Sequence, residues 1–166
     1  IDAFLAAQEN EQARAYIRKV RADTEAIVPQ RFCTNSLVNM LVSSFAQKAE
    51  KKAAVLQVRA ELPRELFLSD TELCSILSNG LENALHAVEK LPVGQRTISL
   101  YCGLRRNNLL IEITNPYAGS IVMQGDLPVS ASAGHGYGCR SIRDIVVRRH
   151  GFCTFETKGG VFVLRA

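Results

Sequence analysis

The sequence predicts an α+β fold, a two-layer α/β sandwich preceded by a partial antiparallel helical hairpin. A capping box, Ser69-Asp-Thr-Glu72, opens an apolar-faced helix that continues to about residue 90. Apolar and polar residues alternate around it at 55–62, 96–104 and 109–115, as they do in half-buried strands. A second helix, at 139–150, precedes two short strands joined at Gly159-Gly160. Antiparallel hairpins with helices packed on one face form a two-layer α/β sandwich.

The N-terminal third reads as helical. Residues 1–24 carry a loose apolar face, and Pro29 interrupts that pattern. Thr34 is expected to cap a second helix, whose apolar residues recur at three- and four-residue spacing from Leu37 to Ala53. Because two such helices can form an antiparallel hairpin, the chain divides into a partial helical hairpin at 1–54 and a second domain at 55–166.

Two connections are distinctive in the second domain. Residues 105–108, Arg-Arg-Asn-Asn, join two strands and indicate a hairpin. Residues 116–135 are rich in Gly, Ser, Ala and Pro and carry one charge, Asp126. A connection of this length without regular structure is usually functional or disordered.

Composition narrows the class of protein. Hydrophobic residues make up 47% of the 166 residues and the net charge is +4, with basic residues scattered rather than clustered. With 7% aromatics and no Trp, nucleic-acid binding is not expected. The five cysteines are far apart and form no Cys-x-x-Cys pair, so we expect free thiols in a reducing, cytoplasmic compartment and no zinc site.

A polar stripe marks the helix expected at 69–90. Asn79, Glu82, Asn83 and His86 share one helical face, roughly opposite the apolar one. Amide oxygens are hard, neutral ligands that suit a Mg²⁺ ion carried in by a nucleotide. An exposed polar helix face is the alternative when this stripe is considered alone.

A glycine run precedes the last helix. Gly134, Gly136 and Gly138 alternate with other residues, and Arg140 falls in the first turn that follows. Glycines let a backbone approach phosphate groups, and a helix N-terminus offers free N–H groups and a positive dipole. The other interpretation is a flexible linker.

Taken together, these segments resemble the ATP-binding domain of gyrase B, MutL, heat-shock-90 chaperones and histidine kinases, known as the Bergerat or GHKL fold. Asn79-Gly-Leu-Glu-Asn83-Ala resembles the N box, and Asn115-Pro-Tyr-Ala-Gly119 stands where the family has Asp-x-Gly-x-Gly. Gly134-His-Gly-Tyr-Gly138 resembles the second glycine box, and Gly159-Gly160 the final glycine turn. The resemblance covers about residues 55–166.

The resemblance implies roles for individual residues. Asn83 would hold Mg²⁺, and Asn79 would contact phosphate or the attacking group. Hydrolytic relatives have a Glu at the position of Asn79; an Asn cannot act as a general base, which favours phosphotransfer. Asn115 would accept a hydrogen bond from adenine, and Glu82 is the nearest carboxylate for a catalytic role. The lid and phosphate contacts would come from His86, Gly119, Gly134, His135, Gly136, Tyr137, Gly138 and Arg140; Tyr117 replaces a family glycine.

Within this family the chain is similar to sensor histidine kinases of the Agr-like, peptide quorum-sensing type. That implies a two-component kinase that binds ATP and Mg²⁺ and transfers the γ-phosphoryl group to a histidine. No His precedes His86, so the acceptor is expected upstream of this fragment. The resemblance also implies a homodimer, with residues 1–54 as part of the dimerisation and phosphotransfer hairpin. It further implies a response regulator as partner and a membrane-anchored full-length protein with this part in the cytoplasm.

Two other functions stay open at this point. One is a hydrolysing GHKL ATPase, against which Asn79 counts. The other is a nucleotide-binding or pure interaction module without kinase activity; in a pure interaction module, Asn115 and Tyr117 would reflect lost adenine binding.

Overall fold

A computed structural model describes residues 31–129 and 137–166 of the chain. From Arg31 onward the chain forms one compact unit. The helix expected at 1–24 and its interruption at Pro29 lie outside the described residues.

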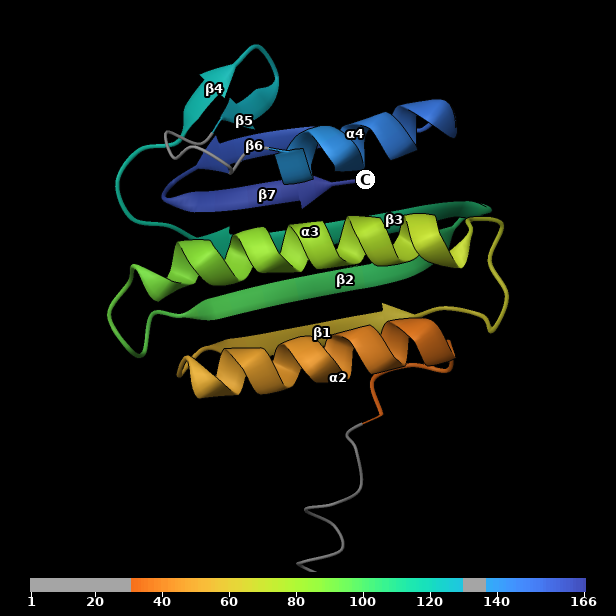
Figure 1. Cartoon of the computed structure of the whole chain (residues 1–166), viewed down its shortest axis with the longest axis horizontal. Helices are drawn as coiled ribbons and strands as arrows, with labels where there is room; N and C mark the ends of the chain where they lie inside the picture. The colour runs from red at the N-terminus through yellow and green to blue at the C-terminus, as the bar shows by residue number, and fades with distance from the viewer. Residues whose placement is uncertain (1–30, 130–136) are drawn as a thin grey trace, which may run out of the picture. The chain divides into compact units, whose positions relative to one another are not determined.

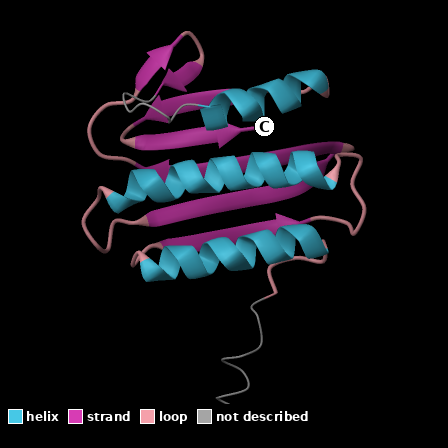
Figure 2. Cartoon of the chain, in the orientation of Figure 1, coloured by secondary structure: helices cyan, strands magenta, loops and turns pink. Residues whose placement is uncertain are grey.

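A five-stranded sheet forms one layer of this unit. Its strand order is β1-β2-β3-β7-β6, in which β1 and β2 are parallel and all other neighbours antiparallel (Figure 2). The sheet strands are β1 Val55–Glu61, β2 Thr97–Arg105, β3 Asn108–Pro116, β6 Thr154–Lys158 and β7 Val161–Arg165. β2 and β3 are joined by Arg106 and Asn107, both at positive φ, in the hairpin that the sequence predicts.

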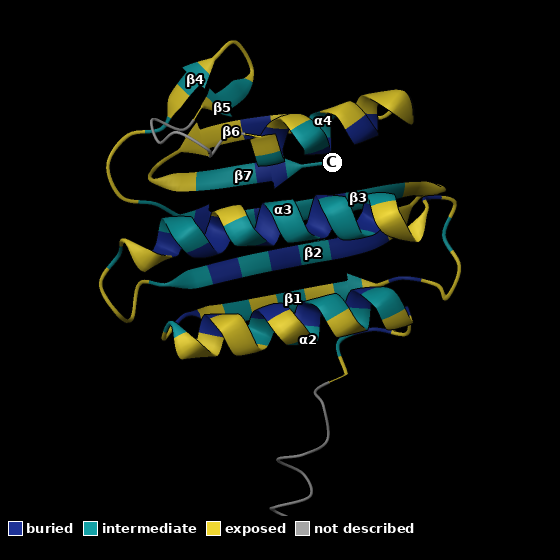
Figure 3. Cartoon of the chain, in the orientation of Figure 1, coloured by how far each residue is buried: buried dark blue, intermediate teal, exposed yellow. Residues whose placement is uncertain are grey.

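Three helices, α2 Ser36–Lys51, α3 Asp70–Glu89 and α4 Tyr137–Arg148, cover one face of this sheet (Figure 1). The core lies between the layers and takes residues from the helices and from the sheet. Figure 3 marks how far each residue is buried along these elements. One row of partnered residues crosses all five strands toward the helices: Val58, Leu100, Ile113, Leu164 and Phe155. The predicted two-layer α/β architecture is therefore confirmed.

The opposite face of the sheet is polar. Arg59, Tyr101, Glu112 and Arg165 are neighbours across four strands. The Arg59 guanidinium lies 5.8 Å from the centre of the Tyr101 ring, and Arg165 Nε lies 2.6 Å from Glu112 Oε2. Alternation of apolar and polar residues along each strand thus separates a core face from a solvated face.

The cap of α2 differs from the prediction. Asn35, not Thr34, is the N-cap: its side chain accepts a hydrogen bond from Val38 N. Thr34 Oγ1 instead donates to the Leu62 carbonyl, 2.6 Å away, beyond the end of β1. The Thr34 hydroxyl, which was predicted to cap the helix, therefore makes a tertiary hydrogen bond instead.

The segment predicted as one loop at 116–135 contains a small hairpin. β4 Val122–Gln124 and β5 Leu127–Val129 pair antiparallel across a two-residue turn in which Gly125 has φ +61°. Glycine at the first position of a two-residue turn favours a hairpin. The prediction missed this turn because it was based on the overall composition of residues 116–135. α4 also begins at Tyr137, two residues before the predicted start.

α2 belongs to the same compact unit as the sheet. Its buried residues Val38, Val42, Phe45 and Ala49 join the core of α3 and β1. The dimerisation role expected for residues 1–54 stays a prediction. Within the described part of the chain, no helix has the length and apolarity that a membrane crossing requires.

Candidate nucleotide site

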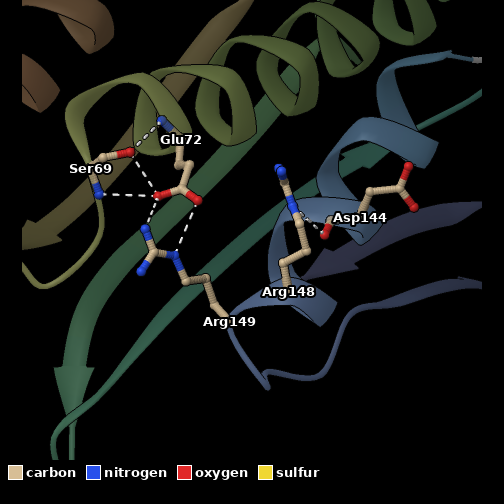
Figure 4. A network of polar contacts seen from close by, with 5 residues as sticks. All are labelled: Ser69, Glu72, Asp144, Arg148 and Arg149. Atoms are coloured by element: carbon tan, nitrogen blue, oxygen red, sulfur yellow. Dashed lines mark hydrogen bonds and ion pairs between the residues drawn. The ribbon is translucent and has the colours of Figure 1, made fainter.

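α3 carries the stripe of polar residues, and its start is held by two sets of contacts. Ser69 and Glu72 form the predicted capping box, in which Ser69 Oγ accepts from Glu72 N and Glu72 accepts from Ser69 N. Arg149, just beyond α4, binds the same Glu72 carboxylate at 2.6 Å (Figure 4). The hydrogen bonds from Arg149 and Ser69 lower the pKa of Glu72 to about 2. These contacts tie the start of α3 to the end of α4.

Further along α3, two amide side chains face the start of α4. A Cβ atom placed on Gly138 would lie 3.4 Å from Asn83 Nδ2 and 3.5 Å from Asn79 Oδ1. Because Gly138 has no side chain, the space above both amides is not filled from α4. The pair of amides and the glycine next to them, all predicted as site residues, are thus brought together.

The amide nitrogens of this pair have protein partners. Asn83 Nδ2 donates to Cys139 Sγ at 3.4 Å, and Asn79 Nδ2 donates to Ser75 Oγ at 3.3 Å. Burial raises the pKa of the Cys139 thiol to about 11, so the sulfur stays protonated near neutral pH. With both nitrogens bound to the protein, the two Oδ1 atoms are the ends that suit a cation or a donor group.

The backbone beneath these amides is held by close packing. Gly80 sits over β3: a Cβ atom there would lie 2.5 Å from Ile113 Cδ1 and 3.0 Å from Leu164 Cδ2. Asn115 follows Ile113 by two residues and therefore shares its face of the sheet. This close approach of α3 to β3 places Asn79 and Asn83 on the helix above the strand end that carries Asn115.

Asn115 is 3% exposed, one of the few buried polar residues of the described chain. Its Nδ2 donates to the Pro116 carbonyl at 2.9 Å, which orients the amide. Tyr117 N donates to Gly160 O at 3.2 Å, so the strand end that carries Asn115 lies next to the Gly159-Gly160 turn. Gly119 has φ +78°, a conformation that favours glycine, where the chain leaves β3.

Glu82 and His86 point toward a different neighbour. Glu82 Oε2 lies 3.2 Å from Lys48 Nζ of α2, and Glu82 Oε1 lies 3.7 Å from His86 Nε2. Lys48 also sits 4.5 Å from the centre of the Phe45 ring. The stripe therefore divides: Asn79 and Asn83 face α4, whereas Glu82 joins α3 to α2.

The first turn of α4 is suited to an anion. It contains no acidic residue, and Arg140 and Tyr137 are exposed there. Free N–H groups and the positive end of the helix dipole add to the charge of Arg140. Gly134, His135 and Gly136 lie outside the described residues.

Two hollows of the structure do not include the amide pair itself. One, of about 410 Å³, lies where α3 begins and α4 ends, between Phe67 and Phe152. Another, of about 680 Å³, is a groove along α3 and α4 that includes Ser75 and Arg140. Neither is lined by Asn79, Asn83 or Asn115, so the site is assigned from its residue chemistry and not from the size of a pocket.

Sequence reasoning missed three contact residues at this site: Cys139, Ser75 and Lys48. Ser75 could have been found, because it lies four residues before Asn79 on the same helical face. Cys139 and Lys48 reach the stripe from other helices, and no local pattern in the sequence predicts these contacts.

Comparison with known families identifies the chain. A family model described as a GHKL domain matches residues 68–166, which is more than half of the sequence. The chain belongs to the GHKL family. Among curated proteins, none matches this chain significantly.

Solved structures of other proteins have the same fold as this GHKL chain. The histidine kinase AdeS of Acinetobacter baumannii aligns over 78% of the chain at a TM-score of 0.55 and 12% identity. The chain spans 62% of the length of that structure. The catalytic domain of histidine kinase ThkA aligns over 80% of the chain and 90% of its own length, at a TM-score of 0.59 and 16% identity. The fold is thus that of histidine kinase catalytic domains, and the GHKL family implies ATP binding.

Proposed function

We propose that this chain is the ATP-binding catalytic part of a sensor histidine kinase of the Agr-like, peptide quorum-sensing type. It binds ATP with Mg²⁺ and transfers the γ-phosphoryl group to a histidine upstream of this fragment. The observation that carries the proposal is the pair of amides, Asn79 and Asn83, facing Gly138 at the N-terminus of α4. This combines neutral oxygen ligands with a helix end that favours phosphate.

The proposal gives each residue a role. Asn83 holds Mg²⁺ through Oδ1, and Asn79 contacts phosphate or the attacking group. In this proposal the ion arrives with the nucleotide, because Mg²⁺ is usually held by a few protein oxygens together with phosphates and water. Bound Mg²⁺ neutralises charge on the phosphates. Asn115 accepts a hydrogen bond from the adenine amino group, and Arg140 supplies positive charge.

The remaining predicted residues surround the nucleotide in this proposal. Gly119, Tyr137 and Gly138, together with the undescribed Gly134, His135 and Gly136, shape the lid and the phosphate contacts. His86 lies beside Glu82 and reaches phosphate only by turning away from it. These assignments follow the motif positions.

The side chains of the polar stripe favour transfer of the γ-phosphoryl group over hydrolysis of ATP. Hydrolysis needs a base that removes a proton from water, and an amide such as Asn79 cannot do this near neutral pH. Glu82 is the nearest carboxylate on the stripe, but its contact with Lys48 would have to break before it could act on the nucleotide. The protein therefore works by positioning and charge stabilisation.

Assembly and location extend this proposal to the longer protein. We propose a homodimer in which one copy presents the acceptor histidine, a response regulator that receives the phosphoryl group, and a membrane-anchored full-length sensor with this part in the cytoplasm. These follow from the kinase type.

The deciding experiment is calorimetric titration with the non-hydrolysable ATP analogue AMP-PNP, with and without Mg²⁺. We expect Mg²⁺-dependent binding, which Asn83→Ala weakens by about tenfold or more, the loss typical of one contact to a charged group. Gln47→Ala is the matched control, because it removes an exposed amide from α2, away from the site. Binding that survives Asn83→Ala unchanged contradicts the metal role, and no binding by the folded wild type contradicts the ATP site.

A further inference from the structure

Cys139 touches the amide group that the proposed function assigns to the metal. Its sulfur accepts a hydrogen bond from Asn83 Nδ2 at 3.4 Å, across the interface between α3 and α4. Asn83 is exposed, whereas Cys139 is only 9% exposed. The nitrogen end of the amide therefore points inward to a buried acceptor, which turns the oxygen end toward solvent.

An exposed amide without such a partner can present either its oxygen or its nitrogen to solvent. The two ends of an Asn side chain have nearly the same shape, so only hydrogen bonding decides which end faces a given side. An NH₂ group turned toward Mg²⁺ repels the cation. A site that uses an amide oxygen as a metal ligand therefore gains from an acceptor behind the nitrogen.

The two neighbours of this contact support the same orientation. Gly138 leaves room beside that nitrogen, since a Cβ atom there would lie 3.4 Å from Asn83 Nδ2. Asn79 is held in the same manner, since its Nδ2 donates to Ser75 Oγ at 3.3 Å. Ser75 Oγ lies 3.5 Å from Ser141 Oγ of α4. α4 thus contacts the nitrogen of Asn83 directly through Cys139, and that of Asn79 only by way of Ser75.

We infer that Cys139 is a positioning residue for Asn83: its sulfur binds the amide nitrogen and thereby presents Oδ1 to the Mg²⁺ of the nucleotide. The inference rests on the proposed function for its consequence, but the orientation itself is a property of the protein without nucleotide. Cys139 touches neither metal nor phosphate in this account. It acts only through Asn83.

The test uses two substitutions at Cys139 and one control. Cys139→Ala removes the acceptor, and Cys139→Ser restores a smaller one. Cys33→Ala is the matched control, because Cys33 is 8% exposed, also makes a hydrogen bond through sulfur, and contacts the start of α2. Circular dichroism and the thermal midpoint establish that each variant is folded.

The first readout is the side-chain amide signal of Asn83 in ¹H–¹⁵N spectra without nucleotide, identified by its loss in Asn83→Ala. We expect Cys139→Ala to shift this signal, Cys139→Ser to return it part of the way, and Cys33→Ala to leave it unchanged. A signal that does not move in Cys139→Ala overturns the inference, whether or not the protein binds ATP.

The second readout is the Mg²⁺ concentration that gives half-maximal binding of AMP-PNP. Since only the correctly oriented fraction of Asn83 binds the ion, we expect Cys139→Ala to raise this concentration by about two- to fivefold. We expect a smaller rise in Cys139→Ser and none in Cys33→Ala. A shifted Asn83 signal without any change in Mg²⁺ requirement overturns the positioning role. A shifted signal in a protein that binds no nucleotide refutes the proposed function and leaves the orientation of Asn83 established.

Discussion

Gly80 shows at the scale of one residue how the helix with the amide pair is placed. A side chain there would begin 2.5 Å from Ile113 Cδ1 and 3.0 Å from Leu164 Cδ2, so these buried side chains would have to shift to make room for it. Glycine inside a helix costs about 0.5–1 kcal/mol relative to alanine. At this position the close packing of α3 on β3 offsets that cost, and it places the amide pair above the strand end that carries Asn115.

Gly80→Ala should therefore lower stability despite the better helix propensity of alanine. Overpacking a tight core costs about 1–3 kcal/mol, which exceeds the propensity gain. Ile113→Val removes the Cδ1 atom that the new methyl group would meet. We expect Ile113→Val to destabilise the wild type and to cost clearly less in Gly80→Ala, as measured by urea unfolding of all four proteins. Additive effects of the two changes would contradict this account of the contact.

At the scale of elements, the start of α2 depends on one buried amide. Asn35 is 5% exposed; its Oδ1 accepts from Val38 N, and its Nδ2 donates to the carbonyls of Pro63 and Arg64. The same side chain thus caps the helix and fastens the segment that follows β1. A cap that bonds only within its own first turn would not also hold a distant segment.

We expect Asn35→Ala to lower the free energy of unfolding by about 2–3 kcal/mol, the sum of one lost cap and two lost hydrogen bonds. Asn35→Ser keeps a capping oxygen and should lie between that variant and the wild type. Ser36→Ala, an exposed change in the same turn, is the control. Chemical denaturation measures all of them, and equal losses in Asn35→Ala and Asn35→Ser would show that the cap contributes nothing.

The pairing of α3 with α4 should depend on pH through Glu72. Its pKa is lowered from 4.5 to about 2 by hydrogen bonds from Arg149 and Ser69. A carboxyl group whose folded pKa is depressed stabilises the protein fully above its unfolded pKa, and this stabilisation disappears as the pH falls toward the folded value. The contribution is therefore complete above about pH 5 and is lost between pH 4.5 and 2.

Thermal midpoints of the wild type and Arg149→Ala test this directly. We expect the wild type to have the higher midpoint at pH 7, and the difference to narrow steadily below pH 4.5. Arg148→Ala is the control, since the hydrogen bond that Arg148 makes within the described part of the chain is to a carbonyl of its own helix, that of Asp144 (Figure 4). A gap between wild type and Arg149→Ala that is as wide at pH 3 as at pH 7 would exclude Glu72 as the titrating group.

For the molecule as a whole, the three described helices and the sheet share one core. α2 contributes Val38, Val42 and Phe45 to that core, all nearly or fully buried. The compact unit accordingly begins at Arg31 and not at the start of β1. The region that must stay together for a stable ATP-binding domain thus includes α2.

Two truncations test where the folding unit begins. A chain of residues 31–166 should fold cooperatively and keep Mg²⁺-dependent binding of AMP-PNP. A chain of residues 55–166 loses, among others, the large buried side chains Val38, Val42 and Phe45. Each is worth about 1.5–3 kcal/mol, and together they are a large share of the roughly 5–15 kcal/mol that stabilises a domain. We expect it to be unfolded or molten by circular dichroism and thermal melting. A cooperative transition in the shorter chain would place α2 outside the essential core.

Local signals let the sequence predict much of this fold. The capping box at Ser69, the alternation in β1, β2 and β3, and the hairpin at residues 105–108 act between near neighbours, so their outcome hardly depends on the rest of the chain. The β4–β5 hairpin was missed for the opposite reason, because its strands are too short for alternation to show. The order of glycine and asparagine motifs was sufficient to indicate the GHKL family.

By itself, the sequence determined the fold class, the family and the helix face that carries Asn79 and Asn83. Only the tertiary structure decided that Asn35 and not Thr34 caps α2, that Glu82 pairs with Lys48, and that Cys139 lies behind the Asn83 amide. These outcomes join residues separated by tens of positions along the chain. Helix period and strand alternation determine which face a residue occupies, but the partner it meets there depends on how helices and sheet pack.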